Sequence, residues 1–194
     1  MASRRFSHAI AEGDGISVVA AVEEPDAAQA AEAQRAEALV VNGDPARLRE
    51  ATGLPILWRA NAAVDRAAEV ADAVTVTLPD ENEDHDPAQR RHEEALALGL
   101  DCAVEVSNEE ELERALELLD PEIFLLAPPY DGEEERLELV LELLAAVPAG
   151  KLAIADLAVT TEDEVHELER AGVDAVIVHA ADVSPLVGDA PPEV

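Results

Sequence analysis

Lysine is almost absent from this sequence, and positive charge is scarce in general. The 194 residues contain 13 Lys and Arg against 44 Asp and Glu, which gives a formal net charge of −31, and Lys151 is the single lysine. A chain with this balance repels phosphate backbones and acidic lipid headgroups, because it has no residues from which to build a basic patch. We therefore expect no nucleic-acid partner and no membrane partner.

Cysteine and long apolar runs are also lacking. Cys102 is the only cysteine, which excludes a disulfide within the chain and a cysteine zinc site. No apolar run approaches the roughly 20 residues of a membrane span, and residues 1–8, MASRRFSH, lack the hydrophobic stretch of a signal peptide. Glu23, Glu105, Asp156 and His179 could form a carboxylate–histidine metal site, but this alternative is less favoured because no two of them lie close together in the sequence. We expect a cytoplasmic protein with no metal and no cofactor.

The sequence is rich in acidic and small aliphatic residues. Hydrophobic residues make up 48% of the chain, with a mean hydropathy of −0.02, and only four residues are aromatic. This content argues against disorder. An acidic surface around an aliphatic core is typical of proteins from a salt-saturated cytoplasm, where a Debye length below about 3 Å screens repulsion between carboxylates. We predict a halophilic protein. The alternative, acidity kept for a binding purpose, is less favoured because the charge is spread over every segment.

Short aliphatic runs recur along the chain with helical spacing of apolar residues between them. Bounded by Gly, Pro, Asp and Asn, such runs are typical of buried parallel strands. The eight predicted strands are residues 16–22, 38–42, 54–58, 73–77, 101–106, 122–126, 151–155 and 174–178. Asp26, Asp44, Asn108 and Thr161 are predicted helix N-caps, and Glu164 completes a capping box with Thr161.

Eight consecutive βα units favour a compact, closed (β/α)8 TIM barrel over an open sheet, which commonly has five or six strands. We expect one barrel domain over residues 1–194, with an N-terminal extension at 1–15 and a short C-terminal tail at 180–194. The tail contains three prolines and is too short for a full outer helix. The groove between the eighth and first strands would then lack its cover, which a second copy of the chain in a homodimer could supply.

Two stretches of the second half carry a family pattern. Residues 102–116, CAVEVSNEEELERAL, resemble LVEVHxxxELxxAL, and residues 160–178, TTEDEVHELERAGVDAVIV, resemble STxEDVxxLxxAGVDAVLVG. Both are patterns of indole-3-glycerol phosphate synthase. Fainter matches lie at residues 16–22, ISVVAAV against VIAEVK, and at residues 55–59, PILWR against PVLRKDF. The resemblance implies a ribulose-phosphate-binding barrel of tryptophan biosynthesis and a lyase activity.

The same resemblance implies that much of the family's catalytic equipment is replaced. The first-strand Glu aligns with Ala21, the first-strand Lys with Glu23 and the third-strand Lys, the family's general acid, with Arg59, while the fifth-strand Glu is kept as Glu105. Arginine keeps its proton and does not readily pass it on. Lys151 lies at the start of the seventh predicted strand, at the end of the barrel away from the chemistry, so no lysine reaches the catalytic face.

Later strands differ from the family pattern as well. The sixth-strand NNR becomes Ala-Pro-Pro at 127–129, and the seventh-strand ESG becomes Asp-Leu-Ala at 156–158. On the eighth strand, the glycine that cradles phosphate aligns with His179. Glycine lets the backbone approach an anion because it has no Cβ, so Ala158 and His179 disfavour an ordinary phosphate cradle.

Polar residues at or just beyond the predicted strand ends form the candidate site, because chemistry in this fold lies at the carboxyl ends of the strands. The catalytic candidates are Glu105, Arg59 and Asp156, and the substrate-binding candidates are Glu23, Asn42, Tyr130 and His179. Structural alternatives are an ion pair between Arg59 and Glu105, and Asp156 as a partner of Arg59 or His179. The other histidines, His8, His85, His92 and His166, are expected to be solvated.

Two functions remain open from the sequence. One is a degenerate synthase-like barrel without the ordinary synthase activity, acting as a small-metabolite-binding, regulatory or structural module. The other is an active, divergent carbon–carbon lyase or isomerase that acts on a small phosphorylated, sugar-like metabolite through Glu105, Arg59 and Asp156.

Overall fold

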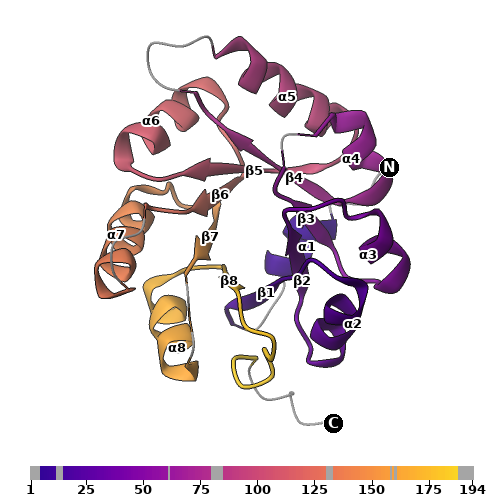
Figure 1. Ribbon diagram of the computed structural model, residues 1–194. Coiled ribbons are helices and arrows are strands. Elements are labelled where there is room, and N and C mark those ends of the chain that lie inside the picture. Colours follow the sequence, from indigo (N-terminus) through magenta and orange to yellow (C-terminus); the bar gives the residue numbers. More distant parts are fainter. Residues whose placement is uncertain are drawn as a thin grey trace.

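The strands close into a barrel. The computed structural model describes residues 5–11, 15–60, 62–79, 85–129, 133–157, 159 and 161–187. Eight parallel strands follow one another around the barrel, and the last pairs with the first (Figure 1). They are β1 Ser17–Ala21, β2 Ala38–Val41, β3 Ile56–Trp58, β4 Ala73–Thr77, β5 Asp101–Val106, β6 Ile123–Leu126, β7 Leu152–Asp156 and β8 Ala175–Val178. Each predicted run coincides with one strand to within two residues at either end, so the predicted barrel is confirmed.

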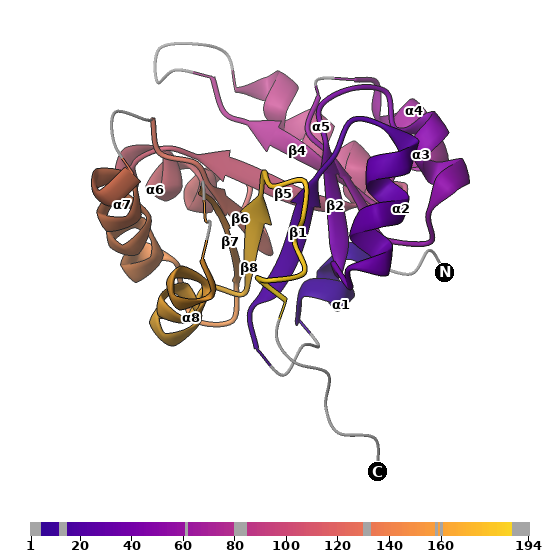
Figure 2. The same ribbon diagram turned by 60° about the horizontal axis from the view of Figure 1, so that its bottom comes forward.

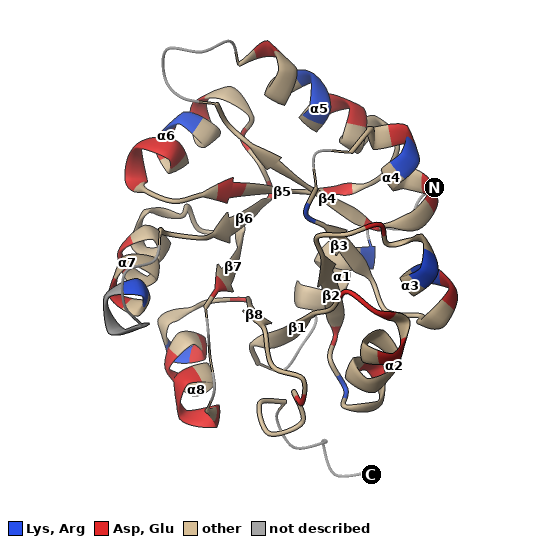
Figure 3. Cartoon of the chain, in the orientation of Figure 1, with Lys and Arg blue, Asp and Glu red and all other residues tan. Residues whose placement is uncertain are grey.

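Within the described residues, seven helices form the outer ring, arranged around the barrel as in Figure 1. They are α2 Pro25–Ala33, α3 Ala46–Ala51, α4 Val64–Val70, α5 Asp86–Ala97, α6 Glu109–Leu118, α7 Glu133–Ala146 and α8 Glu162–Ala171. Acidic residues line the helices around the whole ring (Figure 3). Among the described helices, none has the length and apolar content needed to cross a lipid bilayer.

No helix follows β8 within the described residues, which end at 187. A turn at residues 183–187 takes its place beside β8, between α8 and α2 (Figure 1). Its Val183 and Leu186 side chains are buried, and the Val183 N–H donates to Gln34 Oε1 at 2.7 Å. As far as the described residues extend, up to 187, the predicted absence of a final outer helix is confirmed, and this turn covers part of the groove between β8 and β1.

Side chains inside the barrel are stacked in layers of four, each layer drawn from alternate strands as the parallel register requires. From bottom to top the layers are Ala38, Ala73, Ile123 and Ala175; Val19, Leu57, Ala103 and Ile154; Val40, Thr75, Leu125 and Ile177; and Ala21, Arg59, Glu105 and Asp156. The lower three layers are almost wholly apolar. The top layer, at the carboxyl ends of the strands, carries three charged side chains.

The barrel is closed at its lower end by a helix that precedes β1, α1 Arg5–Ala11 (Figure 2). Its Phe6 and Ile10 side chains are 0% and 2% exposed and pack against the barrel interior. Three of the four residues in the lowest layer are alanines, which leaves room for these two larger side chains. The helix is also tied down, because the Ser7 N–H and Oγ–H donate to the Asp101 carboxylate at 2.9 and 3.0 Å.

Two of the four predicted N-caps are confirmed. The Asn108 side chain accepts from the third residue of α6, and Thr161 forms the predicted capping box at the start of α8. The predictions for Asp26 and Asp44 are wrong. Proline at the first position of α2 starts that helix earlier, so Asp26 lies in its first turn. Helix α3 starts later, and its N-cap is Pro45.

Candidate functional site

Three of the predicted site residues share the top layer of the barrel interior. Arg59 directly follows β3, Glu105 lies near the end of β5, and Asp156 is the last residue of β7. Glu105 is two residues after Ala103, whose side chain is fully buried inside the barrel, so the alternation along the strand turns Glu105 inward as well. Three separate strands thus bring two acids and one base together at the barrel mouth.

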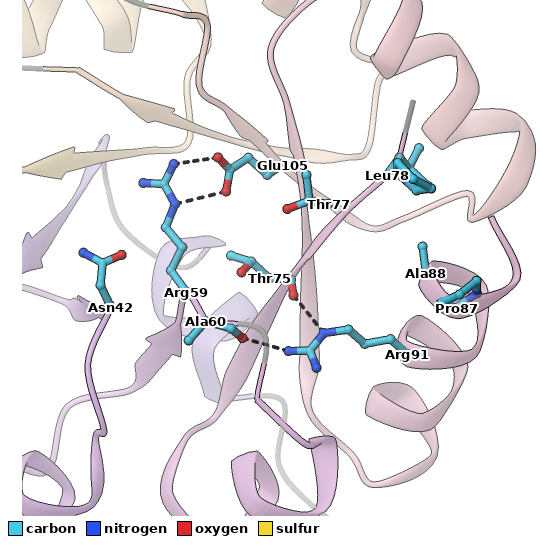
Figure 4. A pocket seen from close by; sticks show the side chains of 11 residues that line it. Asn42, Arg59, Ala60, Thr75, Thr77, Leu78, Pro87, Ala88, Arg91 and Glu105 are labelled. Carbon is cyan, nitrogen blue, oxygen red and sulfur yellow. Dashed lines mark hydrogen bonds and ion pairs between the residues drawn. The ribbon is translucent and has the colours of Figure 1, made fainter. Parts of the chain in front are cut away.

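Arg59 binds both carboxylates. Its Nε and Nη2 lie 3.0 and 2.7 Å from the two Glu105 oxygens (Figure 4), and its Nη1 lies 2.5 Å from Asp156 Oδ2. The contact with Glu105 is bidentate, the geometry in which guanidinium and carboxylate pair most strongly. The side chains of Arg59 and Glu105 are each 22% exposed and that of Asp156 is 6% exposed. Both structural alternatives for Arg59, pairing with Glu105 and with Asp156, therefore occur together.

His179, which directly follows β8, extends this chain of contacts. Its Nε2 lies 2.8 Å from Asp156 Oδ1. Burial alone would raise the pKa of Asp156, but hydrogen bonds from His179 and Arg59, together with the Arg59 charge, lower it below the ordinary value. Burial would likewise lower the pKa of Arg59, but its hydrogen bonds and charge interactions with Glu105 and Asp156 raise it instead. The mouth therefore carries a continuous chain, Glu105–Arg59–Asp156–His179, in which the Asp156 carboxylate is ionised at neutral pH.

Glu23 and Asn42 form a second, separate contact at the rim. Glu23 Oε1 accepts from the Asn42 backbone N–H at 3.4 Å and from its Nδ2 at 3.3 Å. Glu23 Oε2 accepts from the Gly43 N–H at 3.1 Å. These exposed bonds hold the segment after β1 to the segment after β2. Tyr130, the remaining predicted substrate-binding residue, lies outside the described residues.

A cavity of about 670 Å³ opens at this end of the barrel, beside the start of α5 (Figure 4). Its volume falls within the range of small-molecule sites. It is lined by Asn42, Arg59, Ala60, Thr75, Thr77, Leu78, Pro79, Pro87, Ala88, Arg91 and Glu105. Three predicted site residues, Asn42, Arg59 and Glu105, therefore share one cavity.

Arg91 of α5 lines the same cavity, although the sequence did not single it out. It donates from Nε to the Thr75 carbonyl at 3.2 Å, from Nη2 to the Ala60 carbonyl at 3.0 Å and from Nη1 to the Ala62 carbonyl. Strands β3 and β4 pair at only two positions, and Arg91 links the loop after β3 to β4 above them. One weak signal was present: Arg91 lies three residues after Ala88, on the buried side of the helix.

The prediction that His92, the next residue of α5, is solvated is wrong. His92, expected to be solvated, is 8% exposed, and burial lowers its pKa below the ordinary value. It lies on the same helix face as buried Ala88 and Ala95, so the face of α5 turned to the barrel includes an imidazole. Charged residues next to His92 in the sequence, such as Glu93 and Glu94, had favoured a solvated helix face.

The single lysine lies where the sequence placed it. Lys151 directly precedes β7, at the amino end of that strand, and its Nζ lies 2.6 Å from Asp120 Oδ1. The carboxyl end of the same strand, which carries Asp156, faces the mouth. Since the chain has no other lysine, no ammonium group is available at the candidate site.

The closed (β/α)8 barrel places the chain in the TIM-barrel class. Its charged cavity lies at the carboxyl ends of the strands, the end at which the active sites of TIM-barrel enzymes are found. The chain is similar to curated indole-3-glycerol phosphate synthases. It is 40% identical over 98 residues to the protein of Polaromonas naphthalenivorans and 38% identical over 98 residues to that of Variovorax paradoxus, in each case over 50% of this chain and 37% of the relative. No protein-family model matches the chain.

A third relative, the indole-3-glycerol phosphate synthase of Bordetella pertussis, is 35% identical over 97 residues. The chain is thus a closed parallel TIM barrel that is similar in sequence, over about half of its length, to indole-3-glycerol phosphate synthases. The match spans little more than a third of the length of these relatives. Their activity is therefore not carried over to this chain.

Proposed function

We propose that this barrel lacks the ordinary synthase activity and serves as a small-metabolite-binding, regulatory or structural module. The observation that carries the proposal is the state of Arg59. It takes the place of the lysine that the resemblance gives as general acid, and both Glu105 and Asp156 bind it. A general acid works best when its pKa lies near the operating pH, whereas these two carboxylates raise the pKa of an already strong base.

Two further observations support the loss of activity. The only lysine is paired with Asp120 at the opposite end of β7, so it is not available as a substitute donor. On β8, the position of the family's phosphate-binding glycine holds His179, whose ring lies against Asp156. The resemblance implies a small phosphorylated metabolite as ligand. At the position where the family has a glycine, however, this chain has the imidazole side chain of His179.

One contact favours the alternative, an active lyase or isomerase. A carboxylate that holds an imidazole, as Asp156 holds His179 at 2.8 Å, is an arrangement that orients a general base. With Glu105 and Arg59 alongside, it could move a proton on a sugar-like metabolite. In that case Asp156→Asn would abolish turnover and leave the fold intact.

An activity assay tests the proposal. Formation of indole-3-glycerol phosphate is followed by the fluorescence of its indole ring in KCl, with the Polaromonas naphthalenivorans synthase as positive control. We expect no product above background from the wild-type protein. Turnover that disappears in Glu105→Gln or Asp156→Asn would overturn the proposal in favour of an active enzyme. An Arg59→Lys variant tests whether a lysine alone is enough to restore a donor.

The predicted homodimer is part of the same proposal. In the part of the chain that the structure describes, a turn at residues 183–187 and no helix lies on the β8 and β1 side of the ring, and a second copy would cover what the turn does not. Sedimentation equilibrium in high KCl should give a mass near twice 20.6 kDa. A mass of one chain at all concentrations would contradict this part of the proposal, without bearing on catalysis. We also propose a cytoplasmic location.

A further inference from the structure

The lining of the mouth cavity has a charge opposite to that of the molecule. Its ionisable side chains are Arg59, Arg91 and Glu105, formally one positive charge in excess in a chain of net charge −31. Asp156, which does not line the cavity, also pairs with Arg59, so the uncompensated cation of the lining is Arg91. Only 12 arginines are present in the whole sequence, and two of them meet here. A cavity with cationic lining in a strongly anionic molecule is suited to a small anion, because the field of the remaining surface opposes accumulation of anions elsewhere.

Arg91 carries this surplus. Its three acceptors are the neutral carbonyl oxygens of Thr75, Ala60 and Ala62, and no carboxylate of the described residues forms an ion pair with it. Guanidinium has five N–H groups, so two remain for a ligand. Burial lowers the pKa of Arg91, although interactions with Cys102 and Glu94 act in the opposite direction.

We propose that this cavity binds a small hydroxylated carboxylate, with the carboxylate held by the free N–H groups of Arg91. The proposal rests on the proposed function of the barrel as a metabolite-binding module and names the class of metabolite. The Thr75 and Thr77 hydroxyls and the Asn42 amide line the same cavity and supply partners for the hydroxyl groups of the ligand. Leu78, Pro79 and Pro87 supply an apolar wall.

Charge decides between a carboxylate and a phosphate. A carboxylate brings one negative charge and matches the surplus of the lining, whereas a phosphate monoester near neutral pH brings about 1.5 to 2. The excess would face Glu105 inside the cavity. Geometry agrees with this choice, since the planar guanidinium fork matches a planar carboxylate in two parallel hydrogen bonds.

Binding is measured by adding D-glycerate, inorganic phosphate or glycerol to the full chain at constant KCl and recording ¹⁵N–¹H spectra of the arginine Nε–H groups. We expect D-glycerate to shift the Arg91 signal in a saturable manner, phosphate to shift it more weakly and glycerol not to shift it. Saturable binding of phosphate without binding of D-glycerate would overturn the ligand class. No shift of Arg91 with any probe would overturn the site, and neither result depends on whether the synthase assay finds turnover.

Arg91→Gln should weaken D-glycerate binding by about tenfold or more, the usual effect of losing a charge-assisted hydrogen bond. Arg90→Gln is the matched control, because Arg90 is the preceding residue of α5, is exposed and bonds to the Asp86 carbonyl outside the cavity. We expect it to bind as the wild type does. If Arg91→Gln does not fold, Thr77→Val keeps the proposal testable: unchanged affinity in that isosteric variant would contradict the role of the hydroxyls.

Discussion

At the scale of single residues, Arg59 is the side chain on which the barrel mouth depends. It separates Glu105 and Asp156, two carboxylates that would otherwise meet across the top layer without a cation between them. A pair of this kind adds little net stability when intact, but removal of one partner leaves the other charge uncompensated. Arg59 therefore acts as a structural bridge between two carboxylates of the top layer.

Arg59→Met should therefore destabilise the protein by about 2–3 kcal/mol, less than for a fully buried pair because Arg59 and Glu105 are each 22% exposed. Urea unfolding at constant KCl measures the change. The double variant Arg59→Met with Glu105→Gln should recover part of the loss, since only Asp156 then remains charged. Equal stability of wild type and Arg59→Met would show that the bridge is not stabilising.

Asp156 makes the stability of the folded protein depend on pH in the acidic range. Its pKa is lowered in the folded protein relative to the ordinary 3.8, so its contribution to stability is fully present above that value and is lost as the pH falls through the lower, folded pKa. In Asp156→Asn the loss of stability on acidification should be smaller than in the wild type. Urea titrations between neutral pH and about pH 3 measure the two slopes, and parallel curves would contradict the assignment.

At the scale of elements, the strands could be predicted from the sequence and the α1 plug could not. Strand positions depend on local features, namely aliphatic runs with Gly, Pro, Asp or Asn at their ends, and so do the caps Asn108 and Thr161. The role of α1 depends on distant residues: alanines in three strands leave space for it, and Asp101 of β5 holds it. The position of Arg91 in the cavity lining could not be predicted for the same reason, because its acceptors are backbone carbonyls of other elements.

Phe6→Ala tests the plug. The substitution removes a side chain that is 0% exposed and leaves a cavity beneath the lowest layer, so we expect a loss of about 3–5 kcal/mol in unfolding free energy. Leu98→Ala is the control, because it truncates an apolar side chain that is 48% exposed and should change stability by about 0.5 kcal/mol or less. Similar values for the two variants in urea unfolding would show that α1 packs loosely.

At the scale of the whole molecule, the surface charge couples stability to salt. Acidic residues lie on the helices all around the ring, with few cations between them (Figure 3), and the chain carries 31 more negative than positive charges. In dilute buffer these charges repel one another over a Debye length of about 30 Å at 0.01 M salt, and in molar salt over about 3 Å. Unfolding moves the charges apart, so low salt favours the unfolded chain.

We expect the protein to unfold when KCl is lowered from about 3 M to about 0.01 M, followed by far-ultraviolet circular dichroism. Choline chloride at the same ionic strength should preserve the fold if screening alone is responsible. Undiminished stability in dilute buffer would contradict the halophilic prediction and favour the other interpretation, in which the acidity serves binding.

The plug at the base of the barrel also constrains when the chain can fold during synthesis. Ser7 and its acceptor Asp101 are 94 positions apart, and at a translation rate of about 5–20 residues per second that interval lasts roughly 5–20 s. Helix α1 leaves the ribosome before β5, and its Phe6 and Ile10 side chains stay uncovered until β5 has been made. Helix α1 is thus held in place only after five strands have been made, and its apolar face is exposed to chaperones or to other nascent chains throughout that time.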